Sequence, residues 1–205
     1  MGQLIDVVPA LQGAKDAPAG GPIDPVRAEL AAAALLAALG VDLSAEDVAD
    51  TPRRVARMYA ELLTPRPFNP TTFANDAGYD EMVLVRDIRF TSLCAHHLLP
   101  FSGIAHVGYL PGERIVGLSK LARIVSHFSH RLQVQERLTK QVADWLNEEL
   151  QPRGVGVVLR AEHQCMTIRG IQAVGSTTVT STMHGLLRTN PASRDEFLAL
   201  CGEKA

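Results

Sequence analysis

The chain of 205 residues has only three cysteines, almost no net charge and no long hydrophobic run. An odd cysteine count argues against a secreted disulfide framework and for a reducing compartment. A formal net charge of -2 provides no global basic field, so neither nucleic acid nor an anionic membrane is an expected partner. The longest apolar stretch, residues 30–41, is too short to cross a bilayer. No basic stretch precedes an apolar run at the N-terminus, so we expect a cytoplasmic protein.

What the chain does contain is typical of a globular protein, with 46% hydrophobic and 20% charged residues. Residues 1–22 are rich in Gly, Ala and Pro and are expected to form a flexible tail. Residues 23–70 are expected to form a helical region, with one helix beginning after Asp24 and another at Thr51. Residues 71–205 then form a separate domain with a different pattern.

The pattern of this domain indicates two strands, two helices, two further strands and a last helix. The predicted strands cover residues 82–90, 103–109, 156–165 and 176–187, and the predicted helices cover residues 119–130 and 134–150. Ser193 and Glu196 are spaced as a capping box for the last helix. The order predicts an α+β fold, an antiparallel sheet with two helices on one face, preceded by the N-terminal helical region.

Two short clusters of cysteine and histidine are the most informative feature of this sequence. The first is Cys94-Ala-His-His97, and the second, about seventy residues later, is His163-Gln-Cys165. Together they offer thiolate and imidazole ligands, the types that zinc prefers. Histidines that do not bind the metal would remain beside it for proton transfer.

The spacing of these residues suggests which of them bind the metal and which do not. Cys94 and His97 are separated by two residues, a common spacing for a turn that presents two zinc ligands. On the predicted strand His163 and Cys165 leave the same face, so one can bind the metal while the other faces the same pocket. Three protein ligands, Cys94, His97 and Cys165, would leave a fourth position for water, whose pKa zinc lowers toward ~7. His96 and His163 would stay unligated.

The alternative is that these residues are structural, because a lone cysteine usually packs as a small apolar residue and a lone histidine usually finds a structural hydrogen bond. A closed structural zinc site is less favoured, since such sites usually pair their ligands over roughly 12–20 residues. The other histidines are expected at strand or helix surfaces without a site role: His106, His127, His130 and His184. Cys201 is expected to be an ordinary thiol.

A basic segment could bind phosphate. Ser119 could cap a helix whose first turns carry Lys120 and Arg123 on one face, and Arg169 could join them. A helix N-terminus with two cations attracts phosphate, although an isolated Lys-x-x-Arg pair is more often a solvated surface.

A second candidate contact with substrate lies at the start of the following helix. Glu136, beside Gln135, could accept two hydrogen bonds from the adjacent donors of a guanine edge if its carboxylate were buried. Glutamate also favours the first turn of any helix, so this position alone indicates little.

These segments together resemble GTP cyclohydrolase I, in order and from about residue 25 to the C-terminus. The resemblance is carried by Asp50-Thr-Pro-Arg-Arg-Val-Ala-Arg-Met-Tyr59, Cys94-Ala-His-His97, Gly117-Leu-Ser-Lys-Leu-Ala-Arg123, Gln133-Val-Gln-Glu-Arg-Leu138, His163-Gln-Cys165 with Arg169-Gly170, and Thr177-Thr-Val-Thr-Ser181. It implies hydrolysis and ring rearrangement of GTP to 7,8-dihydroneopterin triphosphate and formate, the first step of folate and other pterin synthesis. It also implies the tunnelling fold and a homodecamer of two pentamers with active sites at subunit junctions.

Carried onto this sequence, the resemblance implies a role for each candidate residue. Zinc would be held by Cys94, His97 and Cys165, and the acid–base pair would be His96 and His163. The triphosphate would be bound by Ser119, Lys120, Arg123 and Arg169, and the guanine by Gln135 and Glu136. The pathway that uses the product, whether folate, biopterin or a deazapurine, is not indicated.

One position departs from the family pattern. Ala95 stands where the family usually has Glu, which removes a charge beside the site.

The sequence leaves two alternative functions. One is that of the nitrile reductase of the same fold, which uses a cysteine nucleophile and NADPH and would have a metal-free thiol. The other is a non-catalytic zinc-stabilised assembly protein, which would be expected to have lost some of the ligands, free histidines or phosphate-binding cations.

Overall fold

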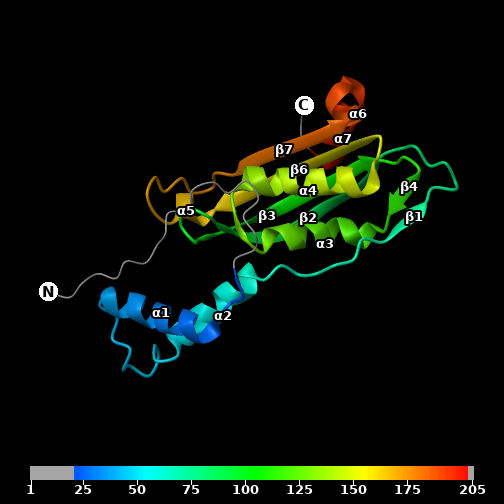
Figure 1. Cartoon of the computed structure of the whole chain (residues 1–205). Coiled ribbons are helices and arrows are strands. Elements are labelled where there is room, and N and C mark those ends of the chain that lie inside the picture. The colour runs from blue at the N-terminus through cyan, green and yellow to red at the C-terminus, as the bar shows by residue number, and fades with distance from the viewer. Residues whose placement is uncertain (1–20, 203–205) are drawn as a thin grey trace, which may run out of the picture. The chain divides into compact units, whose positions relative to one another are not determined.

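The computed structural model describes residues 21–202 (Figure 1). The flexible tail expected over residues 1–22 lies, but for its last two residues, outside this range. The chain divides into two compact units between Ala60 and Glu61, close to the end of helix α2. Within the described range, no helix is both long and apolar enough to cross a membrane.

The first unit contains helix α1 (Pro25–Ala38) and most of helix α2 (Thr51–Leu63). The side chain of Asp24 caps α1, because its Oδ1 accepts hydrogen bonds from the backbone N–H groups of Val26 and Arg27 at 3.1 and 3.0 Å. Pro25 begins the helix, where its missing N–H costs nothing.

The second unit is built on a five-stranded sheet with the order β5-β2-β3-β6-β7 (Figure 1). Its strands are β2 (Val83–Cys94), β3 (Pro100–Leu110), β5 (Leu132–Gln133), β6 (Gly154–His163) and β7 (Thr178–Gly185). All neighbours pair antiparallel except the short β5, which runs parallel to the end of β2. A separate two-stranded sheet pairs β1 (Thr72–Ala74) with β4 (Arg114–Val116).

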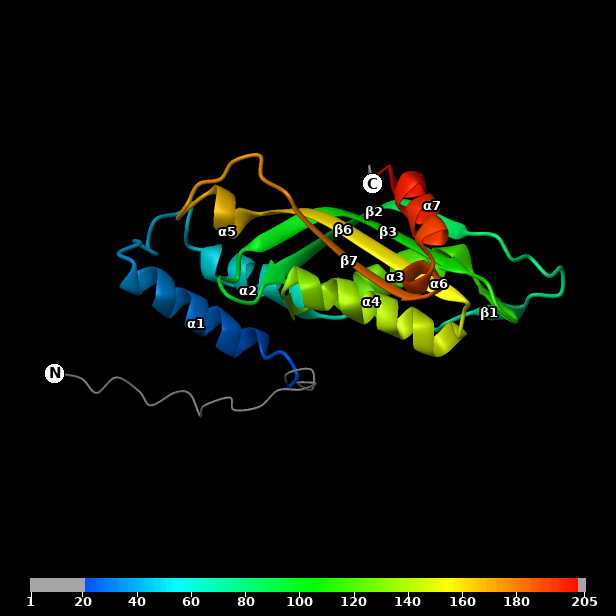
Figure 2. The ribbon, with the colours of Figure 1, turned by 90° about the horizontal axis from the view of Figure 1, so that it is seen from above.

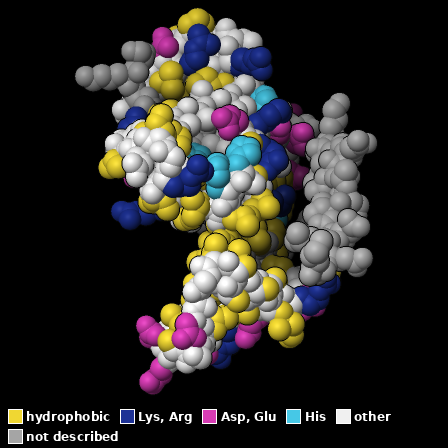
Figure 3. Space-filling view, turned by 90° about the vertical axis from the view of Figure 1, so that its left-hand side faces the viewer, with side chains coloured by type: hydrophobic (Ala, Val, Ile, Leu, Met, Phe, Trp, Pro, Cys, Tyr) yellow, Lys and Arg dark blue, Asp and Glu magenta, His cyan; other side chains and the backbone are white. Residues whose placement is uncertain are grey.

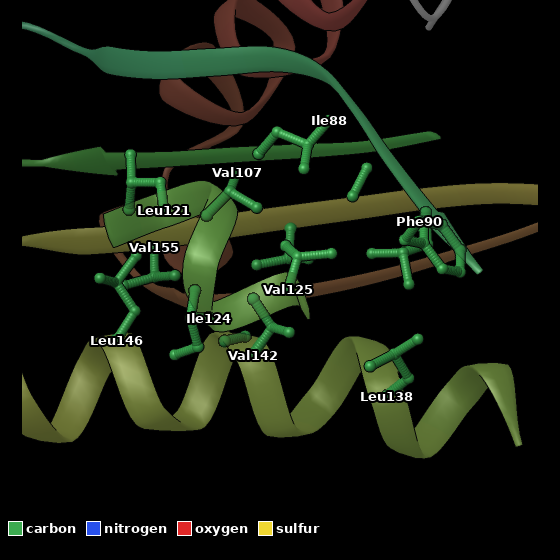
Figure 4. Close-up of a cluster of buried hydrophobic side chains, with 14 of the residues drawn as sticks. Ile88, Phe90, Val107, Leu121, Ile124, Val125, Leu138, Val142, Leu146 and Val155 are labelled. Carbon is green, nitrogen blue, oxygen red and sulfur yellow. The ribbon is translucent and has the colours of Figure 1, made fainter. Parts of the chain in front are cut away.

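Two helices, α3 (Leu118–Ser129) and α4 (Gln135–Leu150), lie on one face of the large sheet (Figures 1 and 2). Apolar residues three and four apart on these helices meet every second residue of the strands, as the two periodicities require. Figure 4 shows this core. It is formed by Ile88, Phe90, Val107 and Val155 of the strands with Leu121, Ile124, Val125, Leu138, Val142 and Leu146 of the helices. The α+β fold with two helices on one face of the sheet is confirmed.

The C-terminal helix α7 (Pro191–Cys201) follows the short α6 (Leu186–Thr189) and packs in a second core. Val158 belongs to this core while its neighbour Val157 belongs to the first, so the second core lies on the opposite face of β6. Gly156 is required here because a Cβ at that position would lie 2.7 Å from the ring of Phe197. The last helix therefore packs on part of the face opposite α3 and α4, while Arg160 and Glu162 on that face of β6 are exposed.

Three local predictions were wrong. The strand predicted to reach residue 165 ends at His163, and the chain turns into the short helix α5 (Gln164–Thr167). Ser119 does not cap α3, which begins after Gly117 without a side-chain cap.

The predicted capping box of the last helix is also wrong. Asn190 caps α7, since its Oδ1 accepts from the N–H groups of Ala192 and Ser193 at 2.9 and 3.3 Å. Pro191 explains the error: its fixed φ suits the first helical position, so the helix begins before Ser193.

Candidate metal centre and active site

The hairpin between β2 and β3 holds the first cysteine–histidine cluster. Cys94 is the last residue of β2, and its N–H donates to the carbonyl of Leu99 at 2.9 Å across the loop. The N–H of Leu98 donates to the carbonyl of Cys94, also at 2.9 Å. Leu98 has a φ of 56°, which lies in the left-handed region. The result is a tight loop in which Cys94 is buried while His96 and His97 are exposed.

The short strand β5 braces this loop from the side. Its two residues pair in parallel with Leu93 and Cys94, and the N–H of Ala95 donates to the carbonyl of Gln133 at 2.8 Å. Gln133 is itself buried, and its amide donates to the carbonyl of Phe128 at the end of α3. Because α4 begins directly after β5, this brace brings the start of α4 beside the cluster.

The second cluster lies at the end of β6 and the start of α5. His163, the last residue of that strand, pairs with Phe101 of β3, and Cys165 lies in the first turn of α5. The prediction that His163 and Cys165 share one face of a strand is therefore wrong. The two cysteines nevertheless meet, with 3.9 Å between the Sγ atoms of Cys94 and Cys165.

The three predicted metal ligands converge. The Sγ of Cys94 lies 3.8 Å from the Nδ1 of His97, and the ligand atoms of Cys94, His97 and Cys165 all lie within 4.8 Å of one another. Tetrahedral zinc, with bonds of about 2.3 Å to sulfur and about 2.0–2.1 Å to nitrogen, separates its ligands by about 3.5–3.8 Å. The donor types and their spacing therefore fit a metal ion, and this group could bind one.

His96 lies beside the group without belonging to it. Its Nδ1 is also 3.8 Å from the Sγ of Cys94, yet it is not among the atoms that converge with Cys165. Figure 3 shows histidine side chains meeting on the surface at this end of the molecule, with basic and acidic side chains around them. The geometry thus distinguishes His97 from His96, as the sequence predicted.

The charge state of Cys165 is set by its surroundings. Burial is the main reason why the pKa of its thiol is raised, and the neighbouring Cys94 raises it further. The positive charge of Arg169 acts in the opposite direction, which locates that guanidinium near the thiol. A metal ion bound here must therefore displace a proton from Cys165.

Two side chains hold the ring of His163: one packs against its face and the other contacts its edge. Its ring stacks on the ring of Phe101, with 4.5 Å between centroids and an angle of 2° between planes. Its Nε2 lies 2.8 Å from the Oε1 of Gln135. Burial lowers the pKa of the imidazole, and the carboxylate of Glu136 opposes that shift. The ring is therefore mostly neutral near pH 7.

The predicted phosphate-binding residues of α3 form a separate group. Lys120 and Arg123, three residues apart, lie in the first two turns of the helix, and Ser119 and Arg123 are exposed. Within residues 21–202, no hydrogen bond or ion pair joins these side chains to the cysteines and histidines described above.

The four histidines without a predicted site role all have hydrogen-bond partners, and those of His106 and His184 could not be expected from the sequence. His106 was expected on the surface, but it is buried, and its Nδ1 accepts from the N–H of Asp87 at 3.3 Å. His184 pairs with Asp144, with 2.9 Å between Nε2 and Oδ1. Cys201 is buried in the second core. Sequence spacing could not reveal these partners, because they come from distant segments.

Comparison with known proteins identifies the family. The sequence pattern of GTP cyclohydrolase I matches residues 28–202. The chain belongs to the GTP cyclohydrolase I family. The resemblance inferred from the motifs is thus confirmed, and the protein is an enzyme of this family that acts on GTP.

Relatives in this family match along most of their length. GTP cyclohydrolase 1 of Aquifex aeolicus is 49% identical over 178 residues, which cover 87% of this chain and 97% of the relative. That of Thermobifida fusca is 51% identical over 189 residues, 90% of each chain. Among solved structures, the apo archaeosine synthase QueF-Like matches 51% of this chain and 93% of its own, with 16% identity and a TM-score of 0.43. That last likeness is too distant to bear on the site.

Proposed function

We propose that this chain converts GTP and water to 7,8-dihydroneopterin triphosphate and formate, with zinc held by Cys94, His97 and Cys165. The observation that supports the proposal is the convergence of these three ligand atoms. Family membership supports the reaction, and the two sulfurs with one imidazole nitrogen are a donor set that suits zinc. When bound, zinc supplies a Lewis acid that makes water acidic enough to attack near neutral pH.

We assign the proton transfers to His163 and His96. As water adds to C8 of the purine, it loses a proton, and N7 of the opening ring must gain one. His163 is mostly neutral near pH 7, so it can take up the first proton and return it to N7. His96, exposed on the neighbouring loop, is available for the later transfers, when formate leaves and the ribose rearranges.

We assign the triphosphate to the start of α3 and to Arg169. Lys120 and Arg123 add two positive charges to the N–H groups of a helix N-terminus, and Ser119 adds a hydroxyl. Arg169 lies near Cys165, so it can join the triphosphate to the metal end of the site. The triphosphate is remote from C8, so its binding mainly positions the purine.

We assign the guanine edge to Glu136, whose carboxylate lies close enough to His163 to influence its pKa. Gln135 was predicted to share this contact. Its two amide hydrogens are shared among three acceptors inside the protein, the carbonyls of Leu159 and Thr178 and the Oγ1 of Thr180. Direct contact between Gln135 and guanine stays a prediction.

The organisation of the whole protein is proposed from the same family membership. Residues 71–205 would form the catalytic domain with the tunnelling fold, and residues 23–70 the N-terminal helical region. We propose a cytoplasmic homodecamer of two pentamers, with active sites at subunit junctions.

The proposal is tested by incubating the purified, zinc-loaded protein with GTP while formate and the fluorescent pterin product are measured. Activity should appear with zinc, disappear after chelation and return when zinc is added. Formation of no product above the chelated control would contradict the proposed reaction.

The division between ligands and acid–base residues is tested with two variants. His163→Ala should lose turnover while keeping the zinc stoichiometry of the unmodified protein, and Cys165→Ser should lose both. Zinc content by elemental analysis separates the outcomes. Loss of zinc from His163→Ala would reassign that histidine as a ligand.

A further inference from the structure

Gln135, the first residue of α4, has one of the least exposed polar side chains of the described chain, at 1% of its surface. Its Nε2 lies 3.1 Å from the carbonyl of Leu159 and 2.9 Å from the carbonyl of Thr178. It also lies 3.1 Å from the Oγ1 of Thr180. The amide thus ties α4 to both β6 and β7.

These partners decide which way the amide of Gln135 points. Backbone carbonyls can only accept hydrogen bonds, so the nitrogen of the amide must face Leu159 and Thr178. Its oxygen, Oε1, then faces the Nε2 of His163 at 2.8 Å. An amide oxygen carries no hydrogen, so the Nε2 of His163 must carry one and donate it.

A chain of two threonines supports the same arrangement. The Oγ1 of Thr139 lies 2.7 Å from the carbonyl of Gln135, to which it can only donate. Thr180 Oγ1 lies 2.6 Å from Thr139 Oγ1 and therefore donates to it. Thr180 is left as an acceptor for the amide of Gln135. The hydroxyl hydrogens of Thr139 and Thr180 thus each have one consistent position.

The other ring nitrogen of His163, Nδ1, has no hydrogen-bond partner in the described part of the chain. Stacking on Phe101, which is fully buried, holds the plane of the ring, and Gln135 holds its Nε2 edge. Within the described residues, Nδ1 makes no hydrogen bond. A neutral ring held in this way presents a lone pair at Nδ1.

We propose that Gln135 is a positioning residue, which holds His163 as the Nε2–H tautomer and leaves Nδ1 as the atom that takes up and returns the proton. This inference rests on the proposed function, in which His163 is an acid–base residue. The opposite tautomer would present an N–H where a lone pair is needed. A catalytic histidine in the wrong tautomer can cost a hydrolase up to about 10⁴ in kcat.

The tautomer can be measured directly in the unmodified protein. Solid-state NMR of protein labelled with ¹⁵N-histidine distinguishes a protonated ring nitrogen from an unprotonated one, whatever the size of the assembly. The signal of His163 is identified by its absence from His163→Gln. At about pH 8, where neutral imidazole dominates, Nε2 of His163 should be protonated. A protonated Nδ1 would overturn the proposal.

Kinetics then separate positioning from substrate contact. Gln135→Met keeps the length of the side chain but offers His163 no oxygen, so we expect kcat to fall by about 10²-fold with the KM for GTP within about threefold. Out of water and beside two carbonyls, the carboxyl group of Gln135→Glu should stay protonated, so that one oxygen donates to a carbonyl and the other accepts from His163. This variant should restore kcat at least about tenfold relative to the Met variant. A direct guanine contact would instead be expected to raise KM.

Thr180→Val is the matched control, because it removes a partner of Gln135 without touching His163. Its kcat should stay within about threefold of the unmodified protein, as expected where proton transfer is intact. An equal loss in both variants, or normal kcat in a folded Met variant, would overturn the positioning role. If the Met variant does not fold, the positioning role is tested by the tautomer of His163 in the unmodified protein and by the kcat of the Glu variant. An unmodified protein inactive on GTP contradicts the proposed function, whereas the tautomer measurement stands independently.

Discussion

At the residue scale, Cys165 links the chemistry of the site to pH. Burial and the neighbouring Cys94 raise the pKa of its thiol, so the metal-free site holds a proton there near neutral pH. Zinc binds the thiolate, so each binding event must release that proton. The affinity of the site therefore depends on the proton concentration.

We predict that the apparent affinity for zinc rises with pH between about 6 and 8 and that binding releases protons. Titration calorimetry in buffers with different ionisation enthalpies measures the number released. Cys201→Ser should release the same number, because Cys201 lies in the second core. An affinity independent of pH would contradict a thiolate ligand at Cys165.

The lowered pKa of His163 predicts how the stability of the folded protein changes with pH. Burial lowers its pKa below 6.5 in the folded protein, so around and below pH 6.5 the unfolded chain binds more protons than the folded one. The folded state therefore loses stability as pH falls through this window. On acidification from about pH 7.5 to about 5.5, the unmodified protein should lose more stability than His163→Gln.

The measurement is the free energy of unfolding in urea at several pH values. Both proteins are compared without metal, so that protonation of the cysteines cancels. Parallel curves for the two proteins would show that His163 titrates alike in the folded and unfolded states.

At the scale of elements, the start of α7 shows how a turn residue decides where a helix begins. Ser193 and Glu196 have the spacing of a capping box, but Asn190 forms the cap, with Pro191 at the first helical position. The helix carries Phe197 into the second core, so its start matters for packing on the sheet.

We predict that Asn190→Ala lowers the free energy of unfolding by about 0.5–2 kcal/mol, because two N–H groups lose their acceptor. Ser193→Ala, the matched control inside the helix, should change it by less than about 0.5 kcal/mol. Urea unfolding followed by circular dichroism measures both. A larger loss of unfolding free energy in Ser193→Ala than in Asn190→Ala would instead support the capping box at Ser193.

At the scale of the whole molecule, the metal group joins parts of the chain that are distant in sequence. Cys94 ends a strand, and Cys165 lies in the first turn of a helix 71 residues later. A metal ion bound to both holds the β2–β3 hairpin against the end of β6. Because the unfolded chain has no such preformed site, binding stabilises the folded state.

We predict that chelation of zinc lowers the melting temperature. At a free zinc concentration of 100 Kd the stabilisation is about 2.7 kcal/mol, or roughly 5–10 °C for a protein of this size. Scanning calorimetry with and without zinc measures the shift. Cys165→Ser should melt at the same temperature in both conditions, and a zinc-dependent shift in that variant would place the metal elsewhere.

Much of the fold was predictable because it depends on local periodicity. The four long strands and the helices α3 and α4 lie within a few residues of their predicted positions, since apolar spacing of two or of three to four determines each of them. The short elements β1, β4, β5, α5 and α6 were not predicted. The failures occur where a few residues compete. The turn into α5 after His163 and the cap at Asn190 depend on contacts that no periodic pattern records.

The sequence by itself determined the type of chemistry at this site, because the kinds of ligand and their motif spacings are local properties. It identified the family, and it selected Cys94, His97 and Cys165 over His96 as the metal group that the structure brings together. Only the tertiary structure decided what surrounds His163. Its partners Phe101 and Gln135, and the acceptors that orient Gln135, come from four different elements. A hydrogen bond depends on distance and direction in space, so its partners can be any distance apart along the chain.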